Sequence, residues 1–355
     1  MDKKPKVIIA MSGGIDSSVA AALFKRAGFD VIGVFMKFWA EAGLDTKREN
    51  KCCNQDAEGR ARKVAAKLGI LFYVLNVEKE FKKKVVDYFI REYKVGRTPN
   101  PCVVCNKEIK FKFLLDKALE LKADFIATGH YVKIKKEGRI YKLLKAKDKN
   151  KDQSYFLWKL GQPELKRILF PIGDYNRDEV EKLAKKFNLP AVTSIKKSQE
   201  VCFVLTDLEK FLKKYIATKQ GKILDKKGKI LGSHQGLVFY TIDQRKGIKL
   251  AGGPYFVLAK NSKKNILIVT KNKKDLYKKE IKANEVSWIS GKKPGFPLKV
   301  LTKIRYRHNP AAATLSEMKD KKYKIVLNNP QRAITPGQSL VFYKRNEVLG
   351  GGIIN

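Results

Sequence analysis

The sequence predicts an α/β protein with a doubly wound, mostly parallel sheet, followed by a small central domain and a C-terminal β-barrel. In the first half, short apolar runs alternate with amphipathic segments of helical composition, which is the pattern of βαβ units. In the last part, short alternating strands are separated by turn residues. The chain has 355 residues, more than the ~250–300 at which a single core stops growing, so we expect domains at residues 1–205, 206–280 and 281–355.

The expected elements of the first half alternate between strand and helix. Residues 7–10 form a continuous apolar run, typical of a strand buried on both faces of a parallel sheet. A glycine-rich turn follows, and then a helix over residues 17–27 that ends at Gly28. The remaining elements of this half are expected as strands at residues 31–35, 71–75 and 124–128 and as helices at 111–121 and at 56–68, the latter ending at Gly69.

The pattern changes at about Tyr131. Residues 131–144 predict a hairpin that turns at Glu137 and Gly138. From Gly221 onward the sequence is rich in glycine and in alternating residues, without a long helical segment, which predicts a small barrel at the C-terminal end. The other elements expected here are helices at residues 177–187 and 208–215 and strands at 300–306, 323–327 and 339–343.

The charge of the chain indicates a polyanionic partner. Lysine and arginine number 76 against 35 aspartates and glutamates, a formal net charge of +41. Such an excess favours nucleic acid or an anionic membrane surface over a small neutral substrate. No apolar run approaches the ~20 residues of a membrane span, and the N-terminus lacks a signal-peptide pattern. We therefore expect a cytoplasmic protein without a membrane partner, whose five cysteines serve as thiols, metal ligands or catalysts.

The strongest motif lies between the first strand and the first helix. Glycine lets the backbone approach an anion closely, and N–H groups at the following helix N-terminus point at that anion. Asp16 is expected to act catalytically by holding a phosphate-bound Mg²⁺. The motif is neither a Walker A loop nor a G-x-G-x-x-G fingerprint. It resembles the S-G-G-x-D-S loop (the PP-loop) of the N-type ATP pyrophosphatases, which implies adenylation of a carbonyl oxygen with release of pyrophosphate. The residues expected to hold phosphate are Ala10, Met11, Ser12, Gly13, Gly14, Ile15, Asp16 and Ser17.

Three cysteines are candidates for the nucleophile. Cys102 and Cys105 form a C-x-x-C before the helix expected at residues 111–121, where Lys107 and a helix N-terminus favour thiolate. Cys202 lies far along the chain. The alternatives are a structural zinc half-site for the pair, whose further ligands are not evident, and a small buried hydrophobe for Cys202.

With these residues the sequence resembles the bacterial tRNA-specific 2-thiouridylase family over essentially its whole length. The resemblance implies ATP and Mg²⁺ as cofactors and the wobble uridine (position 34) of tRNAs with lysine-, glutamate- and glutamine-type anticodons as substrate. It also implies a sulfur donor, either a protein or sulfide. The motifs that carry it are SGGIDSS, GRTPNPCVVCNKEIKF, ATGHY, KDQSYFL, SQEVCF, GSHQGLVFYTIDQRKG and TPGQSLVFY.

The resemblance also implies roles for individual residues. Met36 and Gly129 would contact the nucleotide. Cys105 matches the family's nucleophile and Cys202 matches the cysteine that carries a persulfide, so that a disulfide between them would remain after each cycle. The residues that would contact tRNA, the first three of them against the target base, are Asn100, Pro101, Cys102, His130, Lys151, Asp152, Gln153, Arg305, Tyr306 and Gln338.

One departure from the family opens a second route for the sulfur. Some members have aspartate where this chain has Cys102. If Cys102, Cys105 and Cys202 converge, three thiolates would ligate a 4Fe–4S cluster whose open iron binds sulfide. The persulfide and the cluster are therefore both open as sulfur carriers.

Two other kinds of function compete with tRNA thiolation. One is a PP-loop synthetase that makes a small amide or guanidine, which Cys202 and the net charge disfavour. The other is a non-catalytic RNA-binding protein, which the intact SGGIDSS disfavours. His234 and His308 have no metal-ligand spacing and are expected at the surface or facing RNA. The adjacent Cys52 and Cys53 are expected to be structural.

Overall fold

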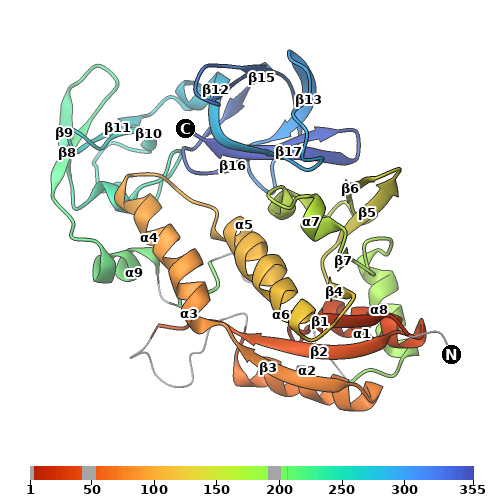
Figure 1. The fold of residues 1–355 in the computed structure, drawn as a ribbon. Coiled ribbons are helices and arrows are strands. Elements are labelled where there is room, and N and C mark those ends of the chain that lie inside the picture. Colours follow the sequence, from red (N-terminus) through yellow and green to blue (C-terminus); the bar gives the residue numbers. More distant parts are fainter. Residues whose placement is uncertain (1–3, 42–52, 191–200, 206) are drawn as a thin grey trace.

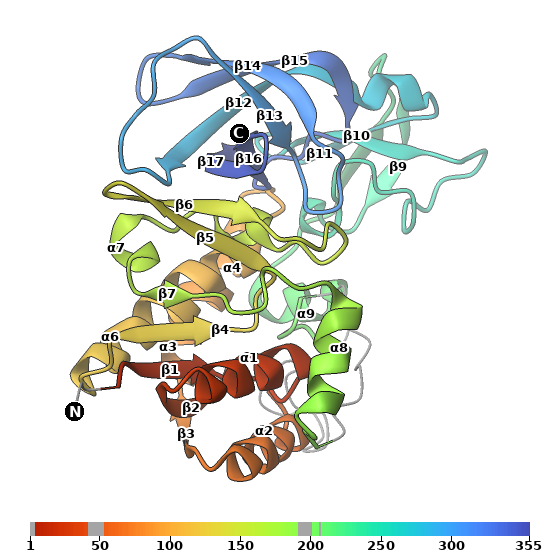
Figure 2. The same ribbon diagram turned by 90° about the vertical axis from the view of Figure 1, so that its right-hand side faces the viewer.

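The computed structural model describes residues 4–41, 53–190, 201–205 and 207–355. It contains a parallel sheet with helices at the N-terminal end, a small β unit and a closed barrel at the C-terminal end (Figures 1 and 2). The predicted fold class is confirmed. Among the helices of the described ranges, none has the length and apolar character needed to cross a membrane.

The N-terminal unit is built on five strands, each parallel to its neighbours. They are β1 (Lys6–Ala10), β2 (Asp30–Lys37), β3 (Leu71–Asn76), β4 (Phe125–Thr128) and β7 (Ile168–Leu169), in the order β3-β2-β1-β4-β7. The central strand β1 buries Val7, Ile8 and Ile9 almost completely, as expected for a strand with neighbours on both sides and cover on both faces. Its carboxyl end therefore lies in the middle of the sheet edge.

The helices around this sheet position the first loop. Helix α1 begins directly after that loop, and its buried alanines let α8 pack against it. Helix α2 ends at Gly69, which has φ 59° and supplies the left-handed cap that the sequence predicts. These helices are α1 (Ile15–Arg26), α2 (Gln55–Leu68), α7 (Gln162–Leu165) and α8 (Arg177–Lys186), and short 3₁₀ turns lie at Ser154–Leu157, Leu237–Phe239 and Lys273–Leu276.

Two longer helical runs contain wider π-helical stretches. They consist of α3 (Glu78–Phe81), the stretch Lys82–Val86 and α4 (Asp87–Lys94), and of α5 (Pro101–Cys105), the stretch Asn106–Phe113 and α6 (Leu114–Glu120). The sequence pattern does not predict the first run. The start expected for the second run, at residue 111, is wrong. The run begins at Pro101, because proline fits the first turn of a helix, where an N–H would have no intrahelical partner.

A hairpin of the N-terminal unit pairs with the C-terminal barrel. The barrel closes because β12 pairs with both β15 and β17, and the hairpin joins it where Leu143 pairs with Val348. The hairpin strands are β5 (Val132–Glu137) and β6 (Ile140–Lys145). The barrel strands are β12 (Tyr277–Trp288), β13 (Leu298–Lys303), β14 (Ala311–Glu317), β15 (Tyr323–Arg332), β16 (Ser339–Lys344) and β17 (Glu347–Ile354). Strand β13 ends earlier than expected, so Arg305 and Tyr306 lie in the turn after it.

The central unit has its own small core around Val257, Leu267 and Val269. It comprises α9 (Leu208–Tyr215), β8 (Gly221–Leu224), β9 (Ile230–His234), β10 (Phe256–Asn261) and β11 (Ile266–Thr270), with the sheet order β10-β11-β8-β9. The surface position expected for His234 is wrong. The residue is 1% exposed, and its Nδ1 accepts the N–H of Gly236 at 3.1 Å. This histidine is structural.

Candidate active site

The predicted phosphate loop lies at the carboxyl end of β1, the edge where parallel sheets bind ligands. Gly13 has φ 69°, and a Cβ on it would stand 2.1 Å from the carbonyl oxygen of Ala57 in α2. Only glycine combines this backbone conformation with so close a contact. The loop is therefore pressed against α2.

Serine hydroxyls hold the loop in shape. Ser17 Oγ donates to the carbonyl oxygen of Gly14 at 2.9 Å and accepts the N–H of Ser12 at 3.2 Å. Ser18 Oγ donates to the same Gly14 oxygen at 3.0 Å. The first intrahelical N–H bond of α1 is that of Ser18 to Gly14. The N–H groups before it belong to the first turn of the helix, where they are available to bind phosphate oxygens.

Met36 and Gly129 lie on the two strands that flank β1. Met36 is buried near the carboxyl end of β2. Gly129 directly follows β4, and a Cβ on it would stand 2.6 Å from the backbone nitrogen of Ser17. Both residues therefore adjoin the loop at the same edge of the sheet. Their contact with a nucleotide stays a prediction.

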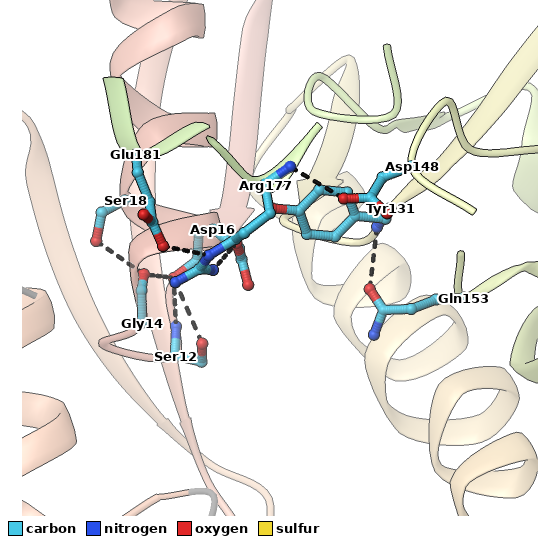
Figure 3. A network of polar contacts seen from close by, with 10 residues as sticks. Ser12, Gly14, Asp16, Ser18, Tyr131, Asp148, Gln153, Arg177 and Glu181 are labelled. Carbon is cyan, nitrogen blue, oxygen red and sulfur yellow. Dashed lines mark hydrogen bonds and ion pairs between the residues drawn. The ribbon is translucent and has the colours of Figure 1, made fainter. Parts of the chain in front are cut away.

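The Asp16 carboxylate is held by two partners from outside the loop (Figure 3). Its Oδ1 accepts the hydroxyl of Tyr131 at 2.8 Å and Nη1 of Arg177, on α8, at 2.8 Å. Burial and the Asp16 carboxylate raise the pKa of Tyr131 above its ordinary value, so its hydroxyl stays protonated and donates. Asp16 is thus fixed at the loop, and a Mg²⁺ ion there would share it with Arg177.

The sequence pattern does not identify two arginines that reach this loop. Arg60 on α2 donates from Nε to the carbonyl oxygen of Gly13 at 3.1 Å. Arg177 reaches Asp16 from the first position of α8. Arg60 has no sequence signal beyond its place on an amphipathic helix. Arg177 does have a sequence signal, which is its position in the first turn of a helix. A cation there is disfavoured by the helix dipole and must be stabilised by another partner.

The C-x-x-C pair lies at the start of the second helical run. Cys102 is exposed and Cys105 is buried, at 8% exposure, in the first turns after Pro101. The positive charge expected to act on Cys105 is partly used elsewhere, because Lys107 forms a close ion pair with Glu164. Because the run begins at Pro101 and not at residue 111, Cys102 lies in its first turn and Cys105 lies one turn further in, where the helix N-terminus acts on the thiol less than expected.

Cys202 lies near the first helical run, residues 78–94, which α5 also contacts. Cys202 itself is half-buried, and its neighbour Phe203 packs edge-on against Phe89, with ring centroids 5.2 Å apart. Helix α5 in turn packs against the stretch Lys82–Val86 of that run. The two thiol segments therefore contact one helical run. Lys196, Lys197 and the SQE of the SQEVCF motif lie outside the described residues.

A 4Fe–4S cluster on Cys102, Cys105 and Cys202 stays a prediction. In the ranges that it describes, no group of three or more His, Cys, Asp or Glu side chains is arranged to hold a metal ion. Cys102, Cys105 and Cys202 all fall within those ranges. Cys53 is buried, and its Sγ accepts the N–H of Phe38 at 3.2 Å, in agreement with a structural role. Cys52 lies outside the described residues.

Several predicted tRNA contacts gather around Tyr155 and Phe156. The ring of Tyr306 lies 4.4 Å from that of Phe156, centroid to centroid. Asn100 hydrogen-bonds the Tyr155 hydroxyl, while burial raises the pKa of Tyr155, and the positive charge of Arg305 acts on the same hydroxyl. The barrel turn that carries Arg305 and Tyr306 thus meets the segment just before the C-x-x-C helix.

Residues 96–100, which we call the strap, are held by all three units. The Thr98 N–H donates to the carbonyl oxygen of Pro336 at 2.9 Å, and the Thr98 and Thr241 hydroxyls share a hydrogen bond at 3.0 Å. Gln338 Nε2 donates to the carbonyl oxygens of Thr98, at 2.8 Å, and Pro99, at 3.3 Å. Gln338 therefore has an internal role as well as its predicted contact with tRNA.

The remaining predicted contacts follow β4 and β6. Asp152 is buried, and its carboxylate accepts bonds from Ala146 N and from the N and Oγ of Ser154. Gln153 accepts the N–H of Tyr131 at 3.0 Å. His130 shares a hydrogen bond with Thr128 at 2.6 Å. Lys151 is half-buried on the same segment. Their contact with RNA stays a prediction.

A parallel sheet with a serine- and glycine-rich phosphate loop after its first strand defines a PP-loop nucleotide-binding protein, here extended by two β units. Family models match three consecutive segments of the chain: a tRNA methyl transferase HUP domain at residues 5–206, a tRNA methyl transferase PRC-barrel domain at 209–271, and an aminomethyltransferase β-barrel domain at 278–354.

Full-length relatives make the assignment specific. The tRNA-specific 2-thiouridylase MnmA of Clostridioides difficile is 47% identical over 98% of both chains. MnmA 2 of Clostridium tetani is 46% identical over 99% of both, and MnmA of Geobacillus thermodenitrificans is 42% identical over 100% of this chain and 96% of its own. The chain belongs to the tRNA-specific 2-thiouridylase family.

Solved structures are more distant. A predicted subunit of tRNA methyltransferase from Methanocaldococcus jannaschii is 16% identical with a TM-score of 0.32, and the match covers 51% of this chain and 74% of that one. This likeness carries no argument about function.

Proposed function

We propose that this protein is an ATP-dependent tRNA sulfurtransferase that converts the wobble uridine of tRNA to 2-thiouridine. The observation that carries the proposal is the full-length identity of 42–47% to tRNA-specific 2-thiouridylases. The phosphate loop at the carboxyl end of β1 and the net charge of +41 fit a substrate pair of ATP and RNA.

The first step is adenylation of the base. The wobble uridine is single-stranded in the anticodon loop, so it enters a pocket without opening a duplex. Its C2 oxygen attacks the α-phosphorus of ATP, and pyrophosphate leaves. The loop N–H groups bind the phosphates, and Asp16 would hold Mg²⁺, a hard cation suited to carboxylate oxygen, which neutralises phosphate charge when bound.

The second step transfers sulfur. The outer sulfur of a persulfide on Cys202 attacks C2, and AMP leaves with the former C2 oxygen. The Cys105 thiolate then attacks Cys202 Sγ, which breaks the bond between the two persulfide sulfurs and leaves 2-thiouridine on the tRNA. The Cys105–Cys202 disulfide that remains takes two electrons from a thiol reductant, and a sulfur donor restores the persulfide.

Two features bear on the choice between the sulfur carriers. Both thiol segments contact the helical run that contains Phe89, which supports their working together. The three cysteines do not form a ligand group in the described ranges, so no step is assigned to a cluster. Iron content and the visible spectrum of anaerobically purified protein test the cluster directly.

The experiment is nucleoside mass spectrometry of unmodified tRNA after anaerobic incubation with the protein, ATP, Mg²⁺, a thiol reductant and either sulfide, which a cluster could bind, or a persulfide donor of sulfane sulfur, which can load Cys202. We expect 2-thiouridine at position 34 in tRNAs with lysine-, glutamate- and glutamine-type anticodons. The same reaction with and without reconstituted iron separates the two carriers, because full activity without iron excludes the cluster. Absence of 2-thiouridine in both arms would contradict the proposed function.

A further inference from the structure

We infer that Arg177 is a positioning residue that links the segment 148–153 to Asp16 of the phosphate loop, so that tRNA bound on this segment sets the position of the Asp16 carboxylate for ATP cleavage. The inference rests on the proposed function, because it assumes that ATP binds the loop and that tRNA contacts residues 151–153. It concerns a residue that carries no motif of its own. The evidence is a ring of hydrogen bonds that closes through Asp16 (Figure 3).

One half of the ring runs through α8. The Arg177 guanidinium donates to Asp16 Oδ1 at 2.8 Å, and the Arg177 backbone N–H donates to Asp148 Oδ2 at 3.0 Å. The other oxygen of Asp148 accepts the N–H groups of Asn150 and Lys151 at 2.9 and 3.1 Å. One residue therefore contacts the phosphate loop with its side chain and the predicted RNA segment with its backbone.

The other half runs through Tyr131. Its hydroxyl donates to the same Asp16 oxygen at 2.8 Å, while its backbone exchanges two hydrogen bonds with Gln153. Tyr131 is 1% exposed, so this path is shielded from water. Because both halves meet at one oxygen of Asp16, a shift of residues 148–153 changes the position of that carboxylate from two directions.

The charges explain why an arginine occupies this position. Glu181, one turn along α8, accepts Arg177 Nε at 2.7 Å and fixes the plane of the guanidinium. An arginine has five N–H donors, more than Asp16 and Glu181 use, so the same group would have donors left for a phosphate oxygen of bound ATP. Lysine would keep the charge and lose the planar, two-sided geometry.

The segment and α8 are joined at a second point. Lys147 pairs with Glu179 at 2.7 Å, and Glu179 also accepts the N–H of Asn176 at the start of α8. Movement of the segment is therefore transmitted to the first turn of the helix that carries Arg177.

The test measures pyrophosphate release against ATP concentration with and without unmodified tRNA. The rate without tRNA reports slow hydrolysis of ATP by water, and because tRNA is also the acceptor, the stimulation in each variant is compared with that in a matched control. The variants are R177A, R177K and D148A, and the matched control is K185A, which removes one charge from the exposed far end of the same helix. We expect tRNA to stimulate the wild type and K185A equally. In R177A we expect the KM for ATP to rise about tenfold or more and the stimulation to be lost.

The other two variants separate the effect of the positive charge at position 177 from the effect of the hydrogen bond that links Arg177 to Asp148. R177K is expected to recover most of the ATP affinity but not the stimulation. D148A is expected to keep the KM for ATP within about twofold and to lose most of the stimulation, while its affinity for tRNA, measured by filter binding, stays within about twofold. Should R177A fail to fold by circular dichroism, R177K and D148A decide the question.

The outcomes are distinguishable from those of the proposed function. Stimulation of D148A and R177K equal to that of K185A would overturn the inference even if the wild type thiolates tRNA. A wild type that releases no pyrophosphate and makes no 2-thiouridine would overturn the proposed function itself.

Discussion

The phosphate loop and the thiol site are built in different ways. The loop is assembled mostly from neighbours in sequence, and its shape is fixed by close backbone contacts such as that of Gly13 with Ala57. The thiol site draws on Cys105 in α5 and on Cys202, which lies far along the chain. Both thiol segments contact the same helical run, but within the part of the chain that the structure describes no metal-ligand group unites the cysteines.

This difference predicts that adenylation and sulfur transfer respond differently to changes at the cysteines. A preformed anion site binds ATP without rearrangement, because the donors are already oriented. Sulfur transfer needs two cysteines to come within bonding distance of each other, so it depends on the chain around Cys202. Adenylation is therefore expected to tolerate changes at the thiols, and thiolation is not.

The largest expected effect separates these two steps. Cys202→Ala and Cys105→Ala are each expected to lower thiolation by more than about a hundredfold, because each removes a nucleophile, while tRNA binding persists. Thiolation is measured by nucleoside mass spectrometry and tRNA binding by filter retention. Cys53→Ala is the control. It loses a buried contact to Phe38 worth about 1 kcal/mol of unfolding free energy but keeps thiolation. Normal thiolation by Cys202→Ala would refute the persulfide route.

The second effect tests the rigidity of the loop. Gly13→Ala forces a Cβ into the backbone of α2 in a left-handed conformation, so we expect ATP-dependent pyrophosphate release to be lost. Gly59→Ala, in the interior of the same helix and facing open space, is expected to raise the unfolding free energy by about 0.5–1 kcal/mol without loss of activity. Equal activities of the two variants would show that the loop is not preformed.

A smaller effect is expected at the strap. Gln338→Ala removes the bonds to the carbonyl oxygens of Thr98 and Pro99, which precede the C-x-x-C helix. We expect kcat for thiolation to fall about tenfold, because misplaced reacting groups slow the chemistry, and ATP affinity to stay unchanged. Gln331→Ala serves as control, since its amide bonds only to Asn329 two residues back among the contacts described. An unchanged kcat in Gln338→Ala would mean that the barrel does not position the cysteines.

The smallest effect concerns stability rather than chemistry. Burial lowers the pKa of His234 in the folded protein. As the pH drops, its imidazole is therefore protonated in the unfolded chain before it is protonated in the folded protein. The unfolding free energy therefore falls as the pH drops through about 6.5, by at most about 1.4 kcal/mol per pH unit for one proton. His234→Asn is expected to flatten this slope in urea titrations between about pH 5.5 and 7.5. Parallel slopes would show that His234 is not the group responsible.

The sequence predicts the sheet and the loop because their signals are local. An apolar run, a glycine-rich turn and the cap at Gly69 each depend on residues close together in the chain. The start of the second helical run is not predicted correctly, because the φ of Pro101 fits an extended segment as well as the first turn of a helix. The ring through Arg177, Tyr131 and Asp148 joins residues that only the tertiary fold brings together, so no sequence spacing could reveal it.

The central claim is that ATP activates the uridine and that sulfur then replaces the activated oxygen. The most direct measurement is the ratio of AMP, pyrophosphate and 2-thiouridine formed in one reaction with Cys202→Ala beside the wild type. The account predicts equal amounts of all three products from the wild type, and from the variant pyrophosphate without 2-thiouridine, with the AMP retained on the adenylated base. Formation of 2-thiouridine with release of ADP and phosphate, or without ATP, would contradict it.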